Sequence, residues 1–335
     1  VRYGGAYGSW PYYGANVRAF GGLVTLHEVT LEESSGHGLW VSSSSAVTAT
    51  QTTAELNAQH GFYLESGTLL LTEGRATGNN SHGVHLAGGN AVLTAVVAEG
   101  NASDGVNVSR VGLTLENSSI RENGRYGIYT VDVAPVIRGT EVLSNTGDAV
   151  YMEYAGTALD VTGIQNLTAA GNAIDELVVA GTLGGTSVLT TTVAQVYVVN
   201  GLTVPAGASL WVPAGVVVKM KSGQSIRVAG ELDVTGEAGD AVVVTSVRDD
   251  TVGGDTNNDG GGSGPARGDW SAVLVDAGGR ADLAHTLIRY GGAYWTWPYY
   301  GADVRAFGGL VTLHEVTLEE SLGHGLWVSS SSAVT

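Results

Sequence analysis

A short acidic segment holds the side chains best suited to binding a cation. Asp255, Asn257 and Asp259 alternate along the sequence and are followed by Gly260, as at the opening of an EF-hand-type loop. Alternate spacing lets three oxygen ligands converge on one ion, and glycine allows the sharp turn after them. The acidic residue that usually closes such a loop is absent, because Ala266 stands at its position.

Two further carboxylates, Asp249 and Asp250, lie just upstream and could complete the coordination shell. We therefore predict a calcium site that pins the loop and has a structural role. Its ligands would be Asp249, Asp250, Asp255, Asn257 and Asp259. The alternative is a flexible Asp/Asn/Gly loop that binds no ion.

Aromatic residues crowd a second segment, YGGAYGSWPYYGA, which begins at Tyr3 and recurs in altered form from Tyr290. Glycine and proline among the rings predict a loop. Exposed aromatic clusters mark interfaces, and flat rings also stack on sugars. The candidate contacts with another subunit or a glycan are Tyr7, Trp10, Tyr12, Tyr13, Tyr294, Trp295, Trp297, Tyr299 and Tyr300. The alternative is a loop that folds over the flank of the molecule with its rings buried.

Three histidines recur at nearly constant spacing. His37, His60 and His82 each precede a glycine, and Asp104 and Tyr126 continue the series. We expect these side chains to stack on successive turns of the chain. Imidazoles so placed could bind a metal, but stacked columns are the ordinary arrangement in any β-solenoid.

Five Asn-X-Ser/Thr sequons, which permit glycosylation, occur in the same part of the chain. They are at Asn79, Asn101, Asn107, Asn117 and Asn166. Asparagine at the corners of a coiled chain more simply hydrogen-bonds along the stack.

The elements that carry these residues follow a short repeat. Gly38, Gly61, Gly83, Gly105 and Gly127 are 22 or 23 residues apart, and Ala149 and Gly171 continue the series. Each marker is followed by a short run such as GLWV, GFYL or GVHL, and polar corners precede it. Alternation with a period of two predicts strands, and strands that recur with glycine and asparagine corners predict one solenoid coil per repeat.

A long repeat encloses the short one. Residues 288–335 reproduce residues 1–48 with five differences, at an offset of 287 residues. Thirteen coils of 22 residues make 286, close to this offset, and would advance about 6 nm at roughly 4.8 Å per coil. We expect further copies to flank the segment, because neither end carries the polar cap of a terminal solenoid unit; the alternative is end-to-end docking of identical chains.

The coil pattern resembles the right-handed parallel β-helix family, the pectin-lyase-like architecture with many bacterial surface relatives. The resemblance covers most of residues 20–335. It implies an all-β, right-handed parallel β-helix (β-solenoid) with about 22 residues per coil and protruding loops. We expect an aromatic loop region at 1–19, regular coils at 20–180, a less regular continuation with the Asp/Asn/Gly loop at 181–287, and the next long repeat from 288 to 335.

The composition limits the classes of partner that we expect. The chain has 15 basic against 32 acidic residues, a net charge of −17, so nucleic acid and anionic membranes are not expected partners. It contains no cysteine and no apolar run of the length that a membrane helix needs, so we expect no disulfide and no membrane insertion. An extracellular or cell-surface location agrees with the low charge and the predicted calcium.

Near-identical tandem copies favour a structural role, as a repeat unit of an extracellular fibre, stalk or adhesin. Its partners would be copies of itself, as flanking repeats or filament neighbours, with glycans as a further candidate. The alternative is a β-helix protein that binds or degrades polysaccharides as a lyase or hydrolase. We predict no enzyme, because the acidic residues are scattered and form no dense cluster on consecutive coils apart from the Asp255 loop.

Overall fold

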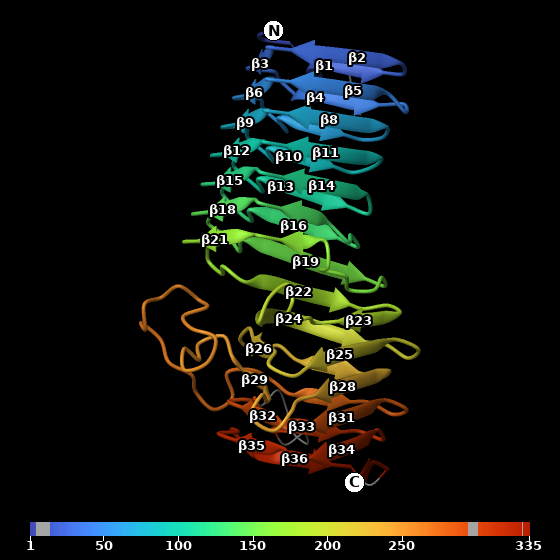
Figure 1. The fold of residues 1–335 in the computed structure, drawn as a ribbon, viewed down its shortest axis with the longest axis vertical. Coiled ribbons are helices and arrows are strands. Elements are labelled where there is room, and N and C mark those ends of the chain that lie inside the picture. Colours follow the sequence, from blue (N-terminus) through green and yellow to red (C-terminus); the bar gives the residue numbers. More distant parts are fainter. Residues whose placement is uncertain (5–13, 294–300, 330) are drawn as a thin grey trace. The chain divides into compact units, whose positions relative to one another are not determined.

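The computed structural model describes residues 1–4, 14–293, 301–329 and 331–335. Every regular element in this part of the chain is a strand, and all the pairings between named strands are parallel. The described chain forms two compact units, one made of residues 1–151 and 162–175 and the other of residues 152–161 and 176–335. Each unit is a β-solenoid, which confirms the predicted fold class (Figure 1).

In unit 1 each coil contributes three short strands, and each strand pairs with its counterparts in the coils before and after. The first stack is β1 (Ala15–Phe20), β4 (His37–Ser42), β7 (Phe62–Leu64), β10 (Val84–Leu86), β13 (Val106–Ser109) and β16 (Ile128–Val131). The second is β2 (Leu23–His27), β5 (Ala46–Thr50), β8 (Thr68–Thr72), β11 (Asn90–Thr94), β14 (Gly112–Glu116), β17 (Val136–Arg138) and β20 (Ile164–Gln165). The third is β3 (Thr30–Glu32), β6 (Thr53–Glu55), β9 (Arg75–Thr77), β12 (Val97–Glu99), β15 (Ser119–Arg121), β18 (Glu141–Leu143) and β21 (Thr168–Ala170).

The core of unit 1 follows from the alternation along each strand. In β8, Leu69 and Leu71 point inward and are buried, whereas Thr68 and Leu70 point outward and are exposed. The register then places Leu71 beside Leu93, and Leu93 beside Leu115, so equivalent apolar side chains stack in columns. One-residue slips would turn each column outward, and the pattern therefore fixes the register.

The coil length changes at the end of unit 1. Ile137 pairs with Ile164 and Leu143 with Ala170, an offset of 27 rather than 22 residues. The constant spacing predicted that Gly171 continues the glycine series, and this was wrong, because the longer coil shifts the equivalent position. Gly171 lies beside Ser144 at a corner where both residues have a positive φ.

Unit 2 contains the end of β19 (Val150–Ala155) and three columns of paired strands, two of which branch from one long strand. β22 (Leu177–Thr182) pairs with this strand, β24 (Val196–Val204). One column continues from β24 through β26 (Val217–Met220), β29 (Val242–Ser246), β32 (Thr286–Arg289) and β35 (Thr317–Glu319). Another continues from β24 through β27 (Ile226–Val228), β30 (Val273–Val275), β33 (Ala302–Ala306) and β36 (His324–Val328). The third column holds β23 (Thr186–Val188), β25 (Ser209–Pro213), β28 (Glu231–Thr235), β31 (Arg280–Ala284), β34 (Leu310–His314) and β37 (Ala333–Val334). Between β29 and β30 a long loop leaves the strands, visible in orange in Figure 1.

Candidate functional sites

The acidic loop between β29 and β30 brings together only part of the predicted calcium ligands. Carboxylate oxygens of Asp250, Asp255 and Asp259 lie within 4.8 Å of one another. Asp249 instead forms an ion pair with Arg289, whose nitrogen is 2.6 Å from its carboxylate. The side-chain amide nitrogen of Asn257 donates a hydrogen bond to the carboxylate of Asp259 at 2.8 Å. This nitrogen is a donor and cannot be a cation ligand.

A buried lysine supplies positive charge beneath this loop. Lys219 in β26 is fully buried, and its ammonium donates a hydrogen bond to the carbonyl oxygen of Gly254 at 2.6 Å. Burial lowers the pKa of Lys219, while the nearby carboxylates of Glu176, Asp249, Asp250 and Asp255 oppose that shift. The acidic side chains therefore already face protein cations. One signal for this residue was visible in the sequence, a lysine within the apolar run VVVKM.

The aromatic candidates lie outside the described residues. This applies to all nine, in segments 5–13 and 294–300: Tyr7, Trp10, Tyr12, Tyr13, Tyr294, Trp295, Trp297, Tyr299 and Tyr300. Their assignment to an interface or to glycan contact stays a prediction.

The histidine column forms as predicted. The rings of His37 and His60 stack with centroids 5.0 Å apart, and those of His60 and His82 with centroids 5.1 Å apart. His85 joins the cluster from β10, 4.6 Å from the ring of His60. His82 Nδ1 then faces the carboxylate of Asp104 at 3.2 Å.

Each ring in this column accepts a hydrogen bond from the next coil. The backbone N–H of His60 donates to Nδ1 of His37, that of His82 to Nδ1 of His60, and that of Asp104 to Nδ1 of His82. A neutral imidazole that accepts at Nδ1 carries its proton on Nε2 and has no lone pair there for a metal. Burial, and then the neighbouring histidines, lower the pKa of His60 to about 2. The backbone bonds to these rings thus join successive coils, and the His60 ring is neutral.

A buried asparagine ladder runs parallel to the histidines, and sequence reasoning did not identify it as a unit. Its members are Asn57, Asn79, Asn101, Asn123, Asn145 and Asn172. Each side-chain amide donates to the side-chain oxygen of the next member at 2.8 or 2.9 Å. Asn79 and Asn101, which head two of the five sequons, are 1% exposed, so the folded chain does not present them for glycosylation.

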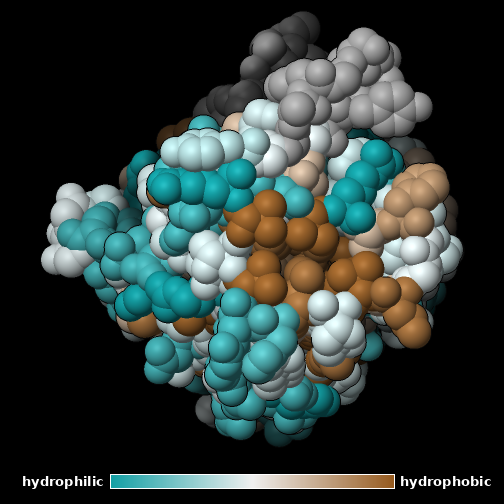
Figure 2. All heavy atoms as spheres, turned by 90° about the horizontal axis from the view of Figure 1, so that it is seen from above, coloured by the Kyte–Doolittle hydropathy of each residue, from teal (hydrophilic) through white to brown (hydrophobic). Residues whose placement is uncertain are grey.

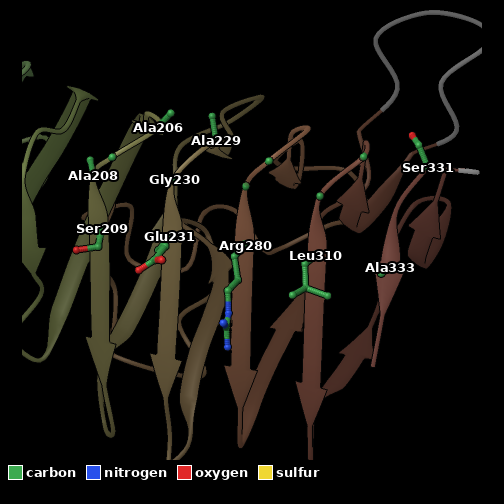
Figure 3. Close-up of a pocket in the computed structure, with 15 residues that line it drawn as sticks. Ala206, Ala208, Ser209, Ala229, Gly230, Glu231, Arg280, Leu310, Ser331 and Ala333 are labelled. Carbon is green, nitrogen blue, oxygen red and sulfur yellow. The ribbon is translucent and has the colours of Figure 1, made fainter.

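A groove of about 670 Å³ follows the corners of unit 2 that precede β25, β28, β31 and β34. Glycine and alanine line most of it, and Glu231 and Arg280 are its charged side chains, as Figure 3 shows. Beside it on the outward face of the same strands, Asp233 pairs in register with Asp282, and Trp211 pairs with Asp233. Partial burial, and then the charge of Asp282, raise the pKa of Asp233.

Comparison with known proteins adds a family. The family model described as "Periplasmic copper-binding protein (NosD)" matches residues 17–183. No curated protein and no solved structure matches the chain significantly. Among the residues that the structure describes, no helix has the length and apolar character needed to cross a membrane.

This match corrects the predicted cofactor. Calcium was wrong, because the family is described as copper-binding. The structure supplies a physical reason as well: Asp249 is neutralised by Arg289, and Lys219 lies under the loop. Of the described residues, only two groups gather three ligand atoms, Asp250 with Asp255 and Asp259, and His285 with His314 and Glu315; both lie beyond residue 183.

Repeated parallel coils, the stacked histidine and asparagine columns and the matched family model agree with one another. The family description is periplasmic, which places its members outside the cytoplasm. Through residues 17–183, about half of its length, this chain is similar to the NosD family, which is described as periplasmic and copper-binding.

Proposed function

We propose that this chain is a structural repeat unit of an exported β-solenoid, in which 287-residue copies stack to build a stalk or fibre at the cell surface. The observation that carries the proposal is a joint between two copies within unit 2. The second copy begins at residue 288, and its first complete coil stacks on the last coil of the copy before it.

The joint continues the solenoid register without a break. Val273 pairs with Val304 and Val275 with Ala306, and in the neighbouring column Ala281 pairs with Val311. These six apolar residues are at most 1% exposed. The backbone N–H of Phe307 donates to the carbonyl oxygen of Val275 at 2.7 Å, so main-chain pairing also crosses the joint.

The same sequence in the first copy shows what the joint covers. Phe20 and Leu23 are 68% and 87% exposed in unit 1, whereas their counterparts Phe307 and Leu310 are half-buried in unit 2. Figure 2 shows apolar side chains gathered over the end of unit 1 that β1, β2 and β3 form. A coil like that of residues 273–289 should be complementary to this face. In unit 2, that coil packs on the second copy of the same sequence.

A stack of this kind suits a mechanical role. Backbone groups of each coil pair with the coils on both sides, and each coil contacts only its neighbours, so copying a repeat lengthens the structure without a new fold. The buried asparagine ladder adds side-chain bonds in the same direction. Adhesion would then belong to the exposed faces rather than to the stack.

Polysaccharide binding is the second candidate function, and the outward face of β25, β28 and β31 favours it. Trp211 is 44% exposed and pairs in register with Asp233, which pairs in turn with Asp282 on the following strand. An exposed ring beside paired carboxylates is the kind of surface on which sugars stack and hydrogen-bond. Binding of acidic and neutral polysaccharides to the chain and to its Trp211→Ala variant tests this candidate.

Electron microscopy of chains that carry one, two and three complete long repeats tests the structural proposal. Thirteen coils at about 4.8 Å each predict that particles lengthen by about 6 nm with every added repeat. Particles whose length does not grow with repeat number would contradict the proposal. A Val311→Asp substitution at each joint should break the series, whereas Thr312→Asp, on the outward side of the same strand, should leave it intact.

A further inference from the structure

Two imidazoles and a carboxylate meet at one corner of unit 2. His285 follows β31, His314 ends β34 and Glu315 comes directly after it. One ligand atom from each side chain lies within 4.8 Å of the others. His285 Nδ1 is 2.8 Å from a carboxylate oxygen of Glu315, and the two imidazole rings are 5.5 Å apart and nearly perpendicular.

The backbone sets this meeting. His285 and Glu315 have φ values of 43° and 53°, so both occupy the left-handed corner that ends a strand. Ala284 pairs in register with His314, and the N–H of His285 donates to the carbonyl oxygen of His314 at 2.9 Å. Corner residues of consecutive coils therefore project in the same direction, one coil apart.

We propose that His285, His314 and Glu315 bind a divalent transition-metal ion. Two imidazole nitrogens and one carboxylate oxygen form a donor set that suits Cu²⁺ and Zn²⁺, whereas hard cations such as Ca²⁺ prefer six to eight oxygens. The side chain of His285 is 23% exposed and that of Glu315 is 63% exposed. His285 is thus held by packing, whereas Glu315 faces solvent. An ion can therefore enter from the side of Glu315 and keep a water molecule.

The site is made by the joint between copies. His285 belongs to the end of the first long repeat, whereas His314 and Glu315 belong to the second copy, where they repeat His27 and Glu28. In an array of such repeats, each joint would carry one metal site. The proposal does not depend on the stalk function, because the three ligands lie in one chain.

His27 and Glu28 provide a matched internal control. His27 Nε2 lies 3.4 Å from the carboxylate of Glu28, and no third ligand atom joins this pair among the described residues. Substitutions there remove the same two side chains from the same corner of the fold without touching the proposed site.

Calorimetric titration of the metal-free chain with CuCl₂ and ZnCl₂ tests the proposal. We expect His285→Ala, His314→Ala and Glu315→Gln each to weaken binding at this site by roughly tenfold or more, and the double variant His27→Ala/Glu28→Gln to leave it unchanged. Electron paramagnetic resonance of the Cu²⁺-loaded chain should show coupling to two imidazole nitrogens, and to one in His314→Ala. Thermal unfolding of each variant separates loss of the site from loss of the fold.

Three results would overturn the proposal. The first is the absence of binding by the intact chain. The second is equal affinity in the intact chain and the three single variants, which would reduce the contact of His285 with Glu315 to an ion pair. The third is binding that Asp255→Asn abolishes, which would assign the ion to the acidic loop. None of these results bears on whether the particles lengthen with repeat number.

Discussion

At the scale of single residues, buried amides hold neighbouring coils of unit 1 together. Asn101 lies in the middle of the asparagine ladder, and its side-chain oxygen accepts hydrogen bonds from the backbone N–H and the side-chain amide of Asn79. Its own amide donates to Ala76 O and to the side-chain oxygen of Asn123. One side chain thus completes four bonds in a place that water does not reach.

Replacing Asn101 with alanine should lower the free energy of unfolding of unit 1 by about 3–5 kcal/mol, because each buried polar group that loses its partner costs about 1–3 kcal/mol. Guanidinium denaturation followed by circular dichroism measures this change. Asn90→Ala removes an exposed amide from β11 and serves as the control, with an expected change below about 0.5 kcal/mol. Equal effects of the two substitutions would show that the ladder does not stabilise the stack.

The histidine column makes the stability of unit 1 depend on pH. Burial, and then neighbouring histidines, lower the pKa values of His37 and His85 to about 4 and of His60 to about 2. The unfolded chain, with histidine pKa values near 6.5, therefore binds more protons than the folded chain below about pH 6.5. Stability is complete above that pH and is lost as the pH falls toward 4.

We expect unit 1 to lose on the order of 2–4 kcal/mol of stability between pH 7.5 and pH 5. Denaturation curves across this range measure the slope. His60→Asn, which keeps an acceptor near the position of Nδ1 but does not titrate, should flatten the curve. The same slope in the variant and the parent would mean that other groups cause the pH dependence.

Residue patterns revealed some of these sites and concealed others. A constant spacing predicted the stack of His37, His60 and His82, because a fixed coil length brings equivalent residues together. The partners His285 and His314 have no such series, since they meet only where one long repeat follows another. Lys219 was missed because its partner Gly254 lies in the long loop between β29 and β30. The regular spacing of the coils says nothing about the position of this loop.

At the scale of the elements, glycine sets how closely the coils approach. A Cβ on Gly83 would lie 2.7 Å from the carbonyl oxygen of Gly105 and 2.7 Å from the side-chain nitrogen of Asn101. Gly61 and Gly127 face comparable contacts. The recurring glycine is therefore a requirement of coil spacing at these positions, where the next backbone leaves no room for a side chain.

Gly83→Ala should destabilise unit 1 by about 1–3 kcal/mol, because the coil must shift or the ladder must break to admit the methyl group. Chemical denaturation gives the change in stability. Gly264→Ala, at an exposed position with no atom within 4 Å of the added Cβ, is the matched control and should be neutral. A Gly83→Ala variant as stable as its parent would show that the coils have slack at this contact.

The sequence predicted the coils as long as their length stayed constant. Alternating apolar residues and evenly spaced glycines determine strand faces and register up to Ala149, and the structure follows them. The five extra residues in the coil that joins Ile137 to Ile164 have no period of their own. Their accommodation depends on packing, so the spacing alone misplaced Gly171.

At the scale of the whole molecule, the repeated sequence offers an internal comparison. Residues 15–26 and 302–313 differ only by Asn16 and Asp303. Among the strands that the structure describes, β1 pairs in register with β4, whereas β33 pairs with both β30 and β36. In the proposed array, this second pairing is the general joint between long repeats. Nothing in the aromatic segments is needed for it.

Hydrogen exchange followed by mass spectrometry on the intact chain tests this claim most directly. Amides of residues 302–313 should exchange more slowly than those of residues 15–26, because backbone bonds such as Phe307 N–H to Val275 O protect only the second copy. Adding a complete long repeat before residue 1 should slow residues 15–26 to the same rate. Equal exchange in the two copies of the parent chain, or no slowing after the addition, would contradict a stacked joint and with it the structural array.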